Sequence, residues 1–232
     1  MPVYSLGSEP QFPHPNMAND EGLLAVGGKL DTDWLLLAYE NGIFPWYNDE
    51  NPILWWSPNP RLIIEPNAFK VSKSFRRVLK KRDFNIKFDH QFDKVINQCK
   101  TIPRNDEEGT WITDEMKEAY INLHQFGVAH SLEVYEQNLL IGGLYGVSLG
   151  KAFFGESMFF KKRDASKVAL YYLCRELSKW DFHFIDAQIE TEHLISLGAV
   201  KIPRTEFLNK LERALNHPTC QGKWTKTIEN EF

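Results

Sequence analysis

The chain has 232 residues, of which 43% are hydrophobic and 25% charged, and its formal net charge at pH 7 is −4. This composition is typical of globular proteins, and the length suffices for one large domain or two small ones. No apolar run reaches the roughly 18 residues needed to cross a bilayer, and we expect no membrane association and no secretion signal. The three cysteines (Cys99, Cys174 and Cys220) fit neither a disulfide framework nor a zinc site, so a reducing cytoplasm is the expected location.

Residues 1–22 are rich in Pro, Asn and Gly and predict an extended lead-in. Asp31 or Thr32 can cap a following helix, which Gly42 ends. The stretch 42–61 then holds three of the seven tryptophans among four prolines. Because prolines exclude regular helix and central strand, these rings are predicted on turns and short extended pieces. There they either fill a small core or stack on a flat group such as a base.

A strongly basic segment runs from Lys70 to Lys87 and carries a net charge of +7, which leaves −11 on the rest of the chain. Ser72 is expected to cap a helix here, with apolar residues on one side and cations on the other. Such a helix is either a solvated surface or a site that attracts a polyanion.

The remainder of the chain predicts helices and strands in alternation. The expected order begins with strand 84–88, helix 91–99, a polar loop at 101–109 and helix 114–126. It continues with strands 131–135, 139–147 and 151–159, helix 164–177, strand 182–188 and short helices at 192–197 and 205–215. The tail after His217 is polar and predicted to be mobile. The order resembles the α+β fold of the GCN5-related N-acetyltransferases, here a domain preceded by a small N-terminal α+β domain.

Several common sites are excluded by the sequence. There is no Gly-rich phosphate loop, and the turn 160–167 lacks the glycine with which coenzyme A-dependent transferases hold the pyrophosphate. None of the seven histidines pairs with another His or Cys at metal-ligand spacing. We therefore expect no metal and no cofactor.

Three polar residues interrupt apolar strands. Glu156 lies in the strand 151–159, and Asp186 and Gln188 lie in the strand 182–188, where alternation predicts that both point to one face. A carboxylate in an apolar strand is costly unless it is paired or serves a ligand. The sequence leaves two interpretations open. The carboxylates of Glu156 and Asp186 either pair with backbone amides or nearby cations, or belong to a catalytic site.

Several blocks of sequence resemble the leucyl/phenylalanyl-tRNA–protein transferase family, in the family's order and over nearly the whole chain. The blocks are GIFPW at 42–46, PILWWSP at 52–58, EEGTWIT at 107–113, GGLYGVSLG at 142–150, FGESMF at 154–159, DASKVAL at 164–170, IDAQ at 185–188 and HLISLGA at 193–199. Ala187 departs from the family, which often has Cys there, and the tail after Pro218 has no match.

The resemblance implies two domains, at 1–62 with the Trp/Pro-rich loop and at 63–232. It also implies transfer of Leu or Phe, and more weakly Met, from aminoacyl-tRNA to proteins that begin with Arg or Lys. Such tagged proteins enter the N-degron pathway of protein degradation. No ATP, metal or coenzyme is implied, and we expect a monomer.

The resemblance also assigns residues to parts of the site. Asp186 would hold the acceptor amine, Gln188 would orient the ester, and Glu156 would pair with the cationic acceptor or brace the site. The terminal adenosine is expected on Trp46, Trp111, Tyr39 and Tyr120. The amino-acid side chain is expected among Phe153, Met158, Leu173 and Ile185. The acceptor stem is expected on Lys73, Arg77 and Lys80.

Three alternatives remain open. A related transferase adds Leu to N-terminal Asp or Glu, but it would need cations where this chain offers Glu156 and Asp186. A cell-wall aminoacyltransferase usually has a duplicated domain that 232 residues cannot easily hold. A plain RNA-binding module would explain the basic helix and the tryptophans but not the strand carboxylates.

Overall fold

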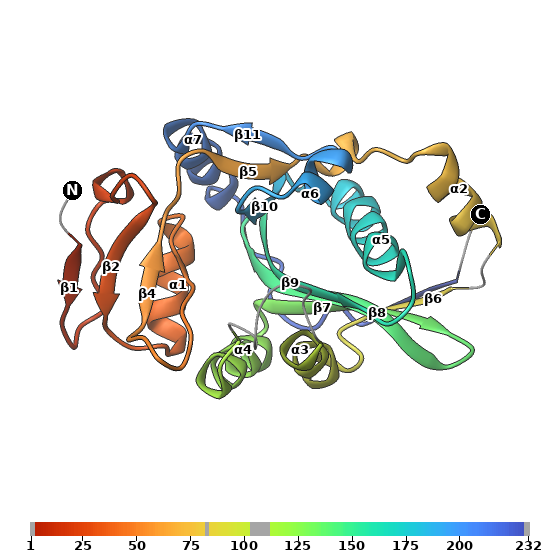
Figure 1. The fold of residues 1–232 in the computed structure, drawn as a ribbon, viewed down its shortest axis with the longest axis horizontal. Coiled ribbons are helices and arrows are strands. Elements are labelled where there is room, and N and C mark those ends of the chain that lie inside the picture. The colour runs from red at the N-terminus through yellow and green to blue at the C-terminus, as the bar shows by residue number, and fades with distance from the viewer. Residues whose placement is uncertain (1–2, 82–83, 103–111, 230–232) are drawn as a thin grey trace.

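The computed structural model describes residues 3–81, 84–102 and 112–229. The N-terminal part contains a four-stranded sheet in the order β1-β2-β4-β3, with one helix, α1, beside it (Figure 1). These elements are β1 (Tyr4–Leu6), β2 (Leu23–Gly27), α1 (Thr32–Glu40), β3 (Phe44–Pro45) and β4 (Leu54–Trp56). Asp31 caps α1 by accepting a hydrogen bond from the Trp34 N–H at 3.1 Å. Between residues 42 and 60 the proline-rich chain forms only the short strands β3 and β4, which fits the predicted short extended pieces.

A larger sheet has eight strands in the order β11-β5-β10-β9-β8-β7-β6-β12. Their bounds are β5 (Arg61–Ile64), β6 (Asn85–Phe88), β7 (Ala129–Glu136), β8 (Leu139–Leu149), β9 (Ala152–Phe160), β10 (Phe184–Gln188), β11 (Val200–Ile202) and β12 (Lys226–Glu229). The strands β7, β8 and β9 form the predicted antiparallel meander, and β10 pairs parallel to β9 after a helical crossover.

Helices cover both faces of the large sheet. Figure 1 shows α3 and α4 on one face and α5 on the other, with α2 at the end remote from the N-terminal sheet. The helices are α2 (Lys73–Lys81), α3 (Phe92–Thr101), α4 (Asp114–Phe126), α5 (Ala165–Lys179), α6 (Glu192–Ser196) and α7 (Arg204–Leu215), with 3-10 turns at Pro15–Met17 and Pro66–Ala68. The predicted α+β class is confirmed.

Two apolar clusters form the core, one on each face of the large sheet. Because successive strand residues point to opposite faces, Phe154 belongs to the cluster with α1, α3 and α4, whereas Phe153 belongs to the cluster with α2 and α5. The first cluster also contains Trp34 of α1 and Trp55 of β4, so the N-terminal part and the large sheet share a core. The domain boundary at residue 62 stays a prediction.

The prediction of a mobile tail is wrong. Residues 226–229 pair with β6 as an antiparallel edge strand, and Trp224 is only 6% exposed. The strand β11 was not expected either, because its three residues carry too little alternation to be recognised. Within the described ranges, no helix combines the length and the apolar character that crossing a membrane requires.

Candidate active site

A cavity of about 370 Å³ opens between β9, β10 and α5. The four residues predicted to hold the amino-acid side chain all line it: Phe153, Met158, Leu173 and Ile185. Leu144, Leu170 and Leu194 extend this apolar lining. The volume lies in the range of small-molecule sites, which are mainly apolar with a few placed polar groups. The structure brings the predicted residues together, while their role as a side-chain pocket stays a prediction.

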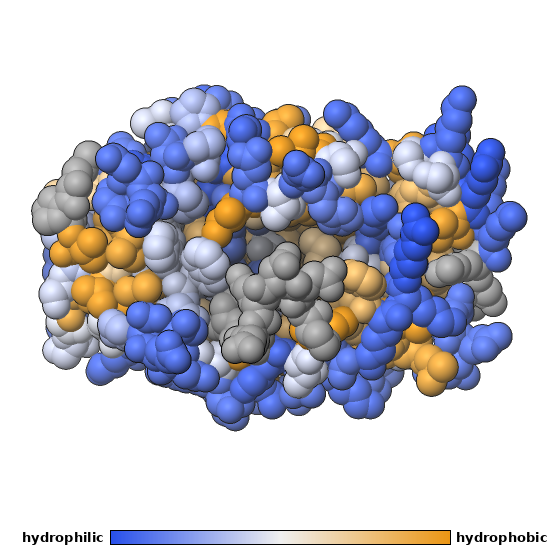
Figure 2. Space-filling view, in the orientation of Figure 1, coloured by the Kyte–Doolittle hydropathy of each residue, from blue (hydrophilic) through white to orange (hydrophobic). Residues whose placement is uncertain are grey.

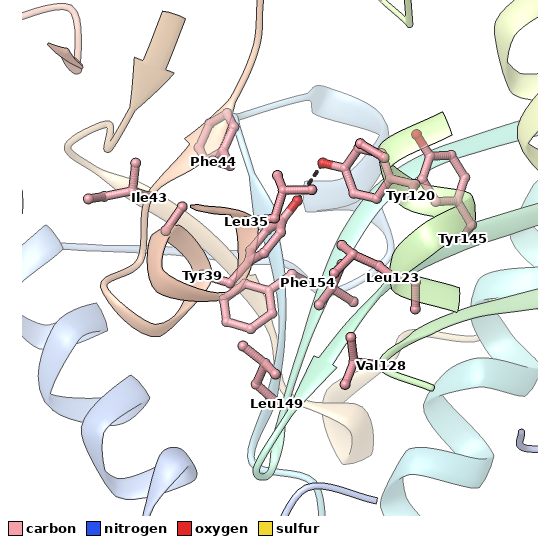
Figure 3. Packing of buried hydrophobic residues seen from close by; sticks show 14 of the residues in the cluster. Leu35, Tyr39, Ile43, Phe44, Tyr120, Leu123, Val128, Tyr145, Leu149 and Phe154 are labelled. Carbon is pink, nitrogen blue, oxygen red and sulfur yellow. Dashed lines mark hydrogen bonds between the residues drawn. The ribbon is translucent and has the colours of Figure 1, made fainter. Parts of the chain in front are cut away.

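Glu156 supplies the acid of the cavity and is bound on both oxygens. Its Oε1 accepts from the Tyr39 hydroxyl at 2.7 Å and from Gln188 Nε2 at 2.7 Å, and its Oε2 accepts from the Tyr120 hydroxyl at 2.8 Å. The two tyrosine hydroxyls are themselves 2.5 Å apart (Figure 3). Residues from α1, α4, β9 and β10 therefore meet at one carboxyl group.

Burial raises the pKa of Glu156 to about 7, although the hydrogen bonds from Tyr39, Tyr120 and Gln188 lower it and nearby Asp186 raises it slightly. Burial and the charge of Glu156 also raise the pKa values of Tyr39 and Tyr120 well above 10, so both stay neutral. A carboxyl group that gains and loses a proton near neutral pH is suited to general acid–base work.

Asp186 has a different environment from the one predicted. Its carboxylate accepts from Arg61 Nε at 2.9 Å and Arg61 Nη2 at 2.7 Å, and from the Gln188 backbone N–H at 2.9 Å. It is fully buried and does not line the cavity. From the sequence, Asp186 was expected to hold the acceptor amine. In the structure its carboxylate oxygens instead accept hydrogen bonds from Arg61 and from the Gln188 backbone N–H.

The predicted alternation along β10 is also wrong. The pairing of β10 with β5 shifts register between Asp186 and Gln188, and Gln188 has a positive φ of 61°. Such a bulge re-aims side chains. As a result Ala187 and Gln188 both line the cavity, whereas Asp186 points into the protein.

Arg61 is the main residue that the sequence analysis missed. It is 1% exposed, and its guanidinium packs over the rings of Phe44 at 4.8 Å and Phe207 at 4.5 Å. The sequence feature that could have indicated a buried arginine is its position at the start of the apolar strand Arg61–Ile64. A charge there needs a buried partner, but local sequence does not reveal which carboxylate provides it.

The aromatic residues predicted to hold adenosine are not equivalent. Trp46 lines the cavity and is 38% exposed, with its ring at 5.7 Å from that of Trp56 in an edge arrangement. Tyr39 and Tyr120 are fully buried and offer no free ring face to a base. In the structure their hydroxyl groups bind Glu156, and their role at the adenosine stays a prediction. Trp111 lies outside the described residues.

The basic helix has the predicted form. Lys73, Arg77 and Lys80 are exposed on α2, while Phe75 and Leu79 are buried. Within residues 3–81, 84–102 and 112–229, no ion pair involves these three cations. Figure 2 shows hydrophilic side chains projecting from this end of the molecule, among apolar patches. The helix thus presents an exposed cationic face.

An apolar cavity, a carboxyl group with a pKa near 7 and an exposed indole together are typical of an enzyme site that receives an apolar group and carries out acid–base chemistry. In the described part of the chain, no cluster of His, Cys, Asp or Glu could hold a metal ion.

The comparisons define the family. The profile of "Leucyl/phenylalanyl-tRNA protein transferase" matches residues 63–212, and that of its N-terminal domain matches residues 28–59. The chain belongs to this family.

Relatives that carry the name leucyl/phenylalanyl-tRNA–protein transferase match almost the whole chain. The protein of Thermodesulfovibrio yellowstonii is 52% identical over 99% of this chain and 93% of its own length. The protein of Anaeromyxobacter sp. (strain K) is 51% identical over 97% of this chain and 96% of its own length. The protein of Legionella pneumophila is 52% identical over 92% of this chain and 96% of its own length. A solved structure of a Staphylococcus epidermidis protein of unknown function is a distant likeness, with a TM-score of 0.43 and 14% identity over 78% of this chain and 68% of that one.

Proposed function

We propose that this protein transfers Leu or Phe, and more weakly Met, from aminoacyl-tRNA to the N-terminal Arg or Lys of acceptor proteins. Family membership supports the reaction class. The observation that carries the proposal for this chain is that one cavity joins four apolar residues, the polar pair Glu156–Gln188 and the exposed Trp46. The product would enter the N-degron pathway, and the enzyme would act as a monomer in the cytoplasm, where charged tRNA is found.

The cavity suits the side chain of the donor amino acid. Its inner lining is provided by Phe153, Met158, Leu173 and Ile185, none of which offers a charge. A flexible methionine adapts to more than one shape, which suits a site that accepts both Leu and Phe. The adjoining Trp46 would stack on the terminal adenine, a contact worth about 1–3 kcal/mol.

The reaction is attack of an α-amine on an ester. The nitrogen lone pair forms the new bond to the carbonyl carbon, the bond from that carbon to the ribose 3′-oxygen breaks, and one amine proton is transferred to the departing oxygen. Gln188 would orient the ester carbonyl, and Glu156 would take the amine proton and return it to the leaving oxygen. Since an α-amine has a pKa of about 7.7–8.0, positioning contributes more than strong base catalysis.

Asp186 and Arg61 would act by positioning. The Asp186 carboxylate accepts a hydrogen bond from the Gln188 backbone N–H and another from the Arg61 guanidinium. This buried pair would fix the bulge that turns Gln188 toward Glu156. The cations of α2 would bind phosphates of the acceptor stem, which position the tRNA without reading its sequence.

The decisive assay uses radiolabelled Phe-tRNA with two peptides that differ only in the first residue, Arg in one and Asp in the other. Label transfer to the Arg peptide alone supports the proposal. Transfer to the Asp peptide alone would assign the chain to the related leucine-adding specificity. Binding of tRNA without transfer to either peptide would reduce it to an RNA-binding protein.

A further inference from the structure

The C-terminal segment, residues 219–229, is fixed along its length to the large sheet and to the turns beside it. Thr219 Oγ1 accepts from the Gly150 N–H at 2.9 Å, and the Gly222 N–H donates to the Gly127 carbonyl at 2.8 Å. The strand β12 then pairs with β6. These contacts hold the intervening residues in one place on the sheet.

Trp224 is the buried anchor of this segment. Its backbone N–H donates to Asp89 Oδ2 at 2.7 Å, and its indole N–H donates to the Cys220 carbonyl at 3.0 Å. The indole stacks on His130 with ring centroids 3.7 Å apart and planes 7° apart, while His130 Nδ1 lies 2.8 Å from the same Asp89 oxygen. Both the position and the plane of the indole are therefore determined.

Phe153 connects this anchor with the cavity. Its ring centroid lies 6.1 Å from that of Trp224, and its side chain also lines the cavity. The ring packs against the backbone of Gly146 as well, where an added Cβ would lie only 2.6 Å from ring atom Cε1. The wall that Phe153 presents to the cavity thus depends on two fixed surfaces, the Gly146 backbone and the Trp224 indole.

We propose that Trp224 is a positioning residue for Phe153 and thereby sets how the cavity discriminates between leucine and phenylalanine. The inference rests on the proposed function of the cavity. A buried indole that is truncated leaves a void which neighbouring side chains fill only in part. Phe153 is a neighbour that borders both the void and the cavity, so its retreat would enlarge the cavity and favour the larger phenylalanine.

The test compares kcat/KM for Phe-tRNA and for Leu-tRNA in the Trp224→Leu variant and in wild type. We expect the Phe:Leu ratio to rise by about 10-fold, the low end of what one methylene contributes in a hydrophobic pocket. The milder Trp224→Phe variant, which keeps most of the buried ring, should shift the ratio in the same direction by a smaller factor. A folded variant with the wild-type ratio would overturn the inference.

Trp180→Leu is the matched control. Its ring lies 4.9 Å from that of Trp224, and the described residues show no ring contact between it and Phe153. This control should keep the wild-type ratio; an equal shift would mean that general loosening of the aromatic cluster, and not support of Phe153, changes selectivity. Wild-type protein that transfers neither amino acid would instead contradict the proposed function itself.

Discussion

The hydroxyl oxygens of Tyr39 and Tyr120 lie 2.5 Å apart, and each also contacts one oxygen of Glu156. These are three oxygen–oxygen contacts, but two tyrosines supply only two hydrogens. The third hydrogen is available when the Glu156 carboxyl is protonated. Burial, and not this ring of contacts, raises the pKa of that group to about 7, because the hydrogen bonds from Tyr39 and Tyr120 lower it.

The first prediction concerns the pH dependence of stability. Because the pKa of Glu156 is about 7 in the folded state and 4.5 ordinarily, the folded protein binds its proton more tightly than the unfolded chain. The stabilisation is complete below about pH 4.5 and is lost as the pH rises through 7. Relative to Glu156→Gln, wild type should therefore lose on the order of 3 kcal/mol of unfolding free energy over this range.

Urea unfolding of both proteins between pH 4.5 and pH 8 measures this difference. Tyr39→Phe provides the directional control, since its hydroxyl lowers the pKa of Glu156. In this variant the loss of stability should move to higher pH. A difference between wild type and Glu156→Gln that does not change with pH would contradict the assignment.

The second prediction concerns the buried pair Arg61–Asp186. Arg61→Met leaves the fully buried Asp186 carboxylate without its cation, which should cost about 3–5 kcal/mol of unfolding free energy. It should also lower kcat more than it raises KM for charged tRNA, because the backbone of Gln188 loses its fixed acceptor. Chemical unfolding and steady-state kinetics measure the two effects.

An exposed ion pair serves as the control for this variant. Lys201 and Glu190 are 3.0 Å apart and about half exposed, so Lys201→Met should cost less than about 1 kcal/mol and leave kcat unchanged. Equal effects of Arg61→Met and Lys201→Met would show that the buried pair does not position the site.

The third prediction concerns α2. Replacing Lys73, Arg77 and Lys80 by Ala should raise KM for charged tRNA and reduce the slope of log affinity against log salt by about 2–3, because each lost phosphate contact removes about 0.7–0.9. The values of kcat should stay close to wild type. Filter binding over a salt series measures the slope.

Three exposed cations outside α2 provide a control with the same change in charge. They are Lys29, Arg213 and Lys223. Their triple Ala variant should keep the wild-type slope. A slope that falls equally in both variants would mean that total charge, and not this helix, determines tRNA affinity.

The sequence predicted what local chemistry determines. Alternation and helical spacing located most of the helices and strands, and Asp31 caps α1 as one of the two residues expected there. The meeting of apolar residues from β9, α5 and β10 was expected from the family resemblance, and the structure brings these residues to one cavity. Contacts between distant segments could not be derived in this way. The Arg61–Asp186 pair joins residues 125 apart, and the bulge after Asp186 breaks the alternation from which its orientation was inferred.

The polar tail was misjudged for a similar reason. Its composition indicates mobility, but the ring of Trp224 is buried among the rings of His130, Trp180 and Phe182. The burial of one indole and the pairing of β12 with an open edge of the sheet offset the ordering entropy of the segment.

The last prediction concerns Trp46, which is exposed at the cavity and which we propose stacks on the terminal adenosine. Trp46→Ala should weaken binding of a phenylalanyl-adenosine analogue by about 1–3 kcal/mol, whereas Trp46→Phe should recover much of the loss, because any aromatic face can stack on a base. Trp34→Phe is the control, since that ring is buried and, among the described residues, its ring contacts are with Phe12 and Trp55, which do not line the cavity. Titration calorimetry with the analogue alone removes any contribution from the tRNA body. Equal affinity of wild type and Trp46→Ala would place the adenosine elsewhere on the enzyme.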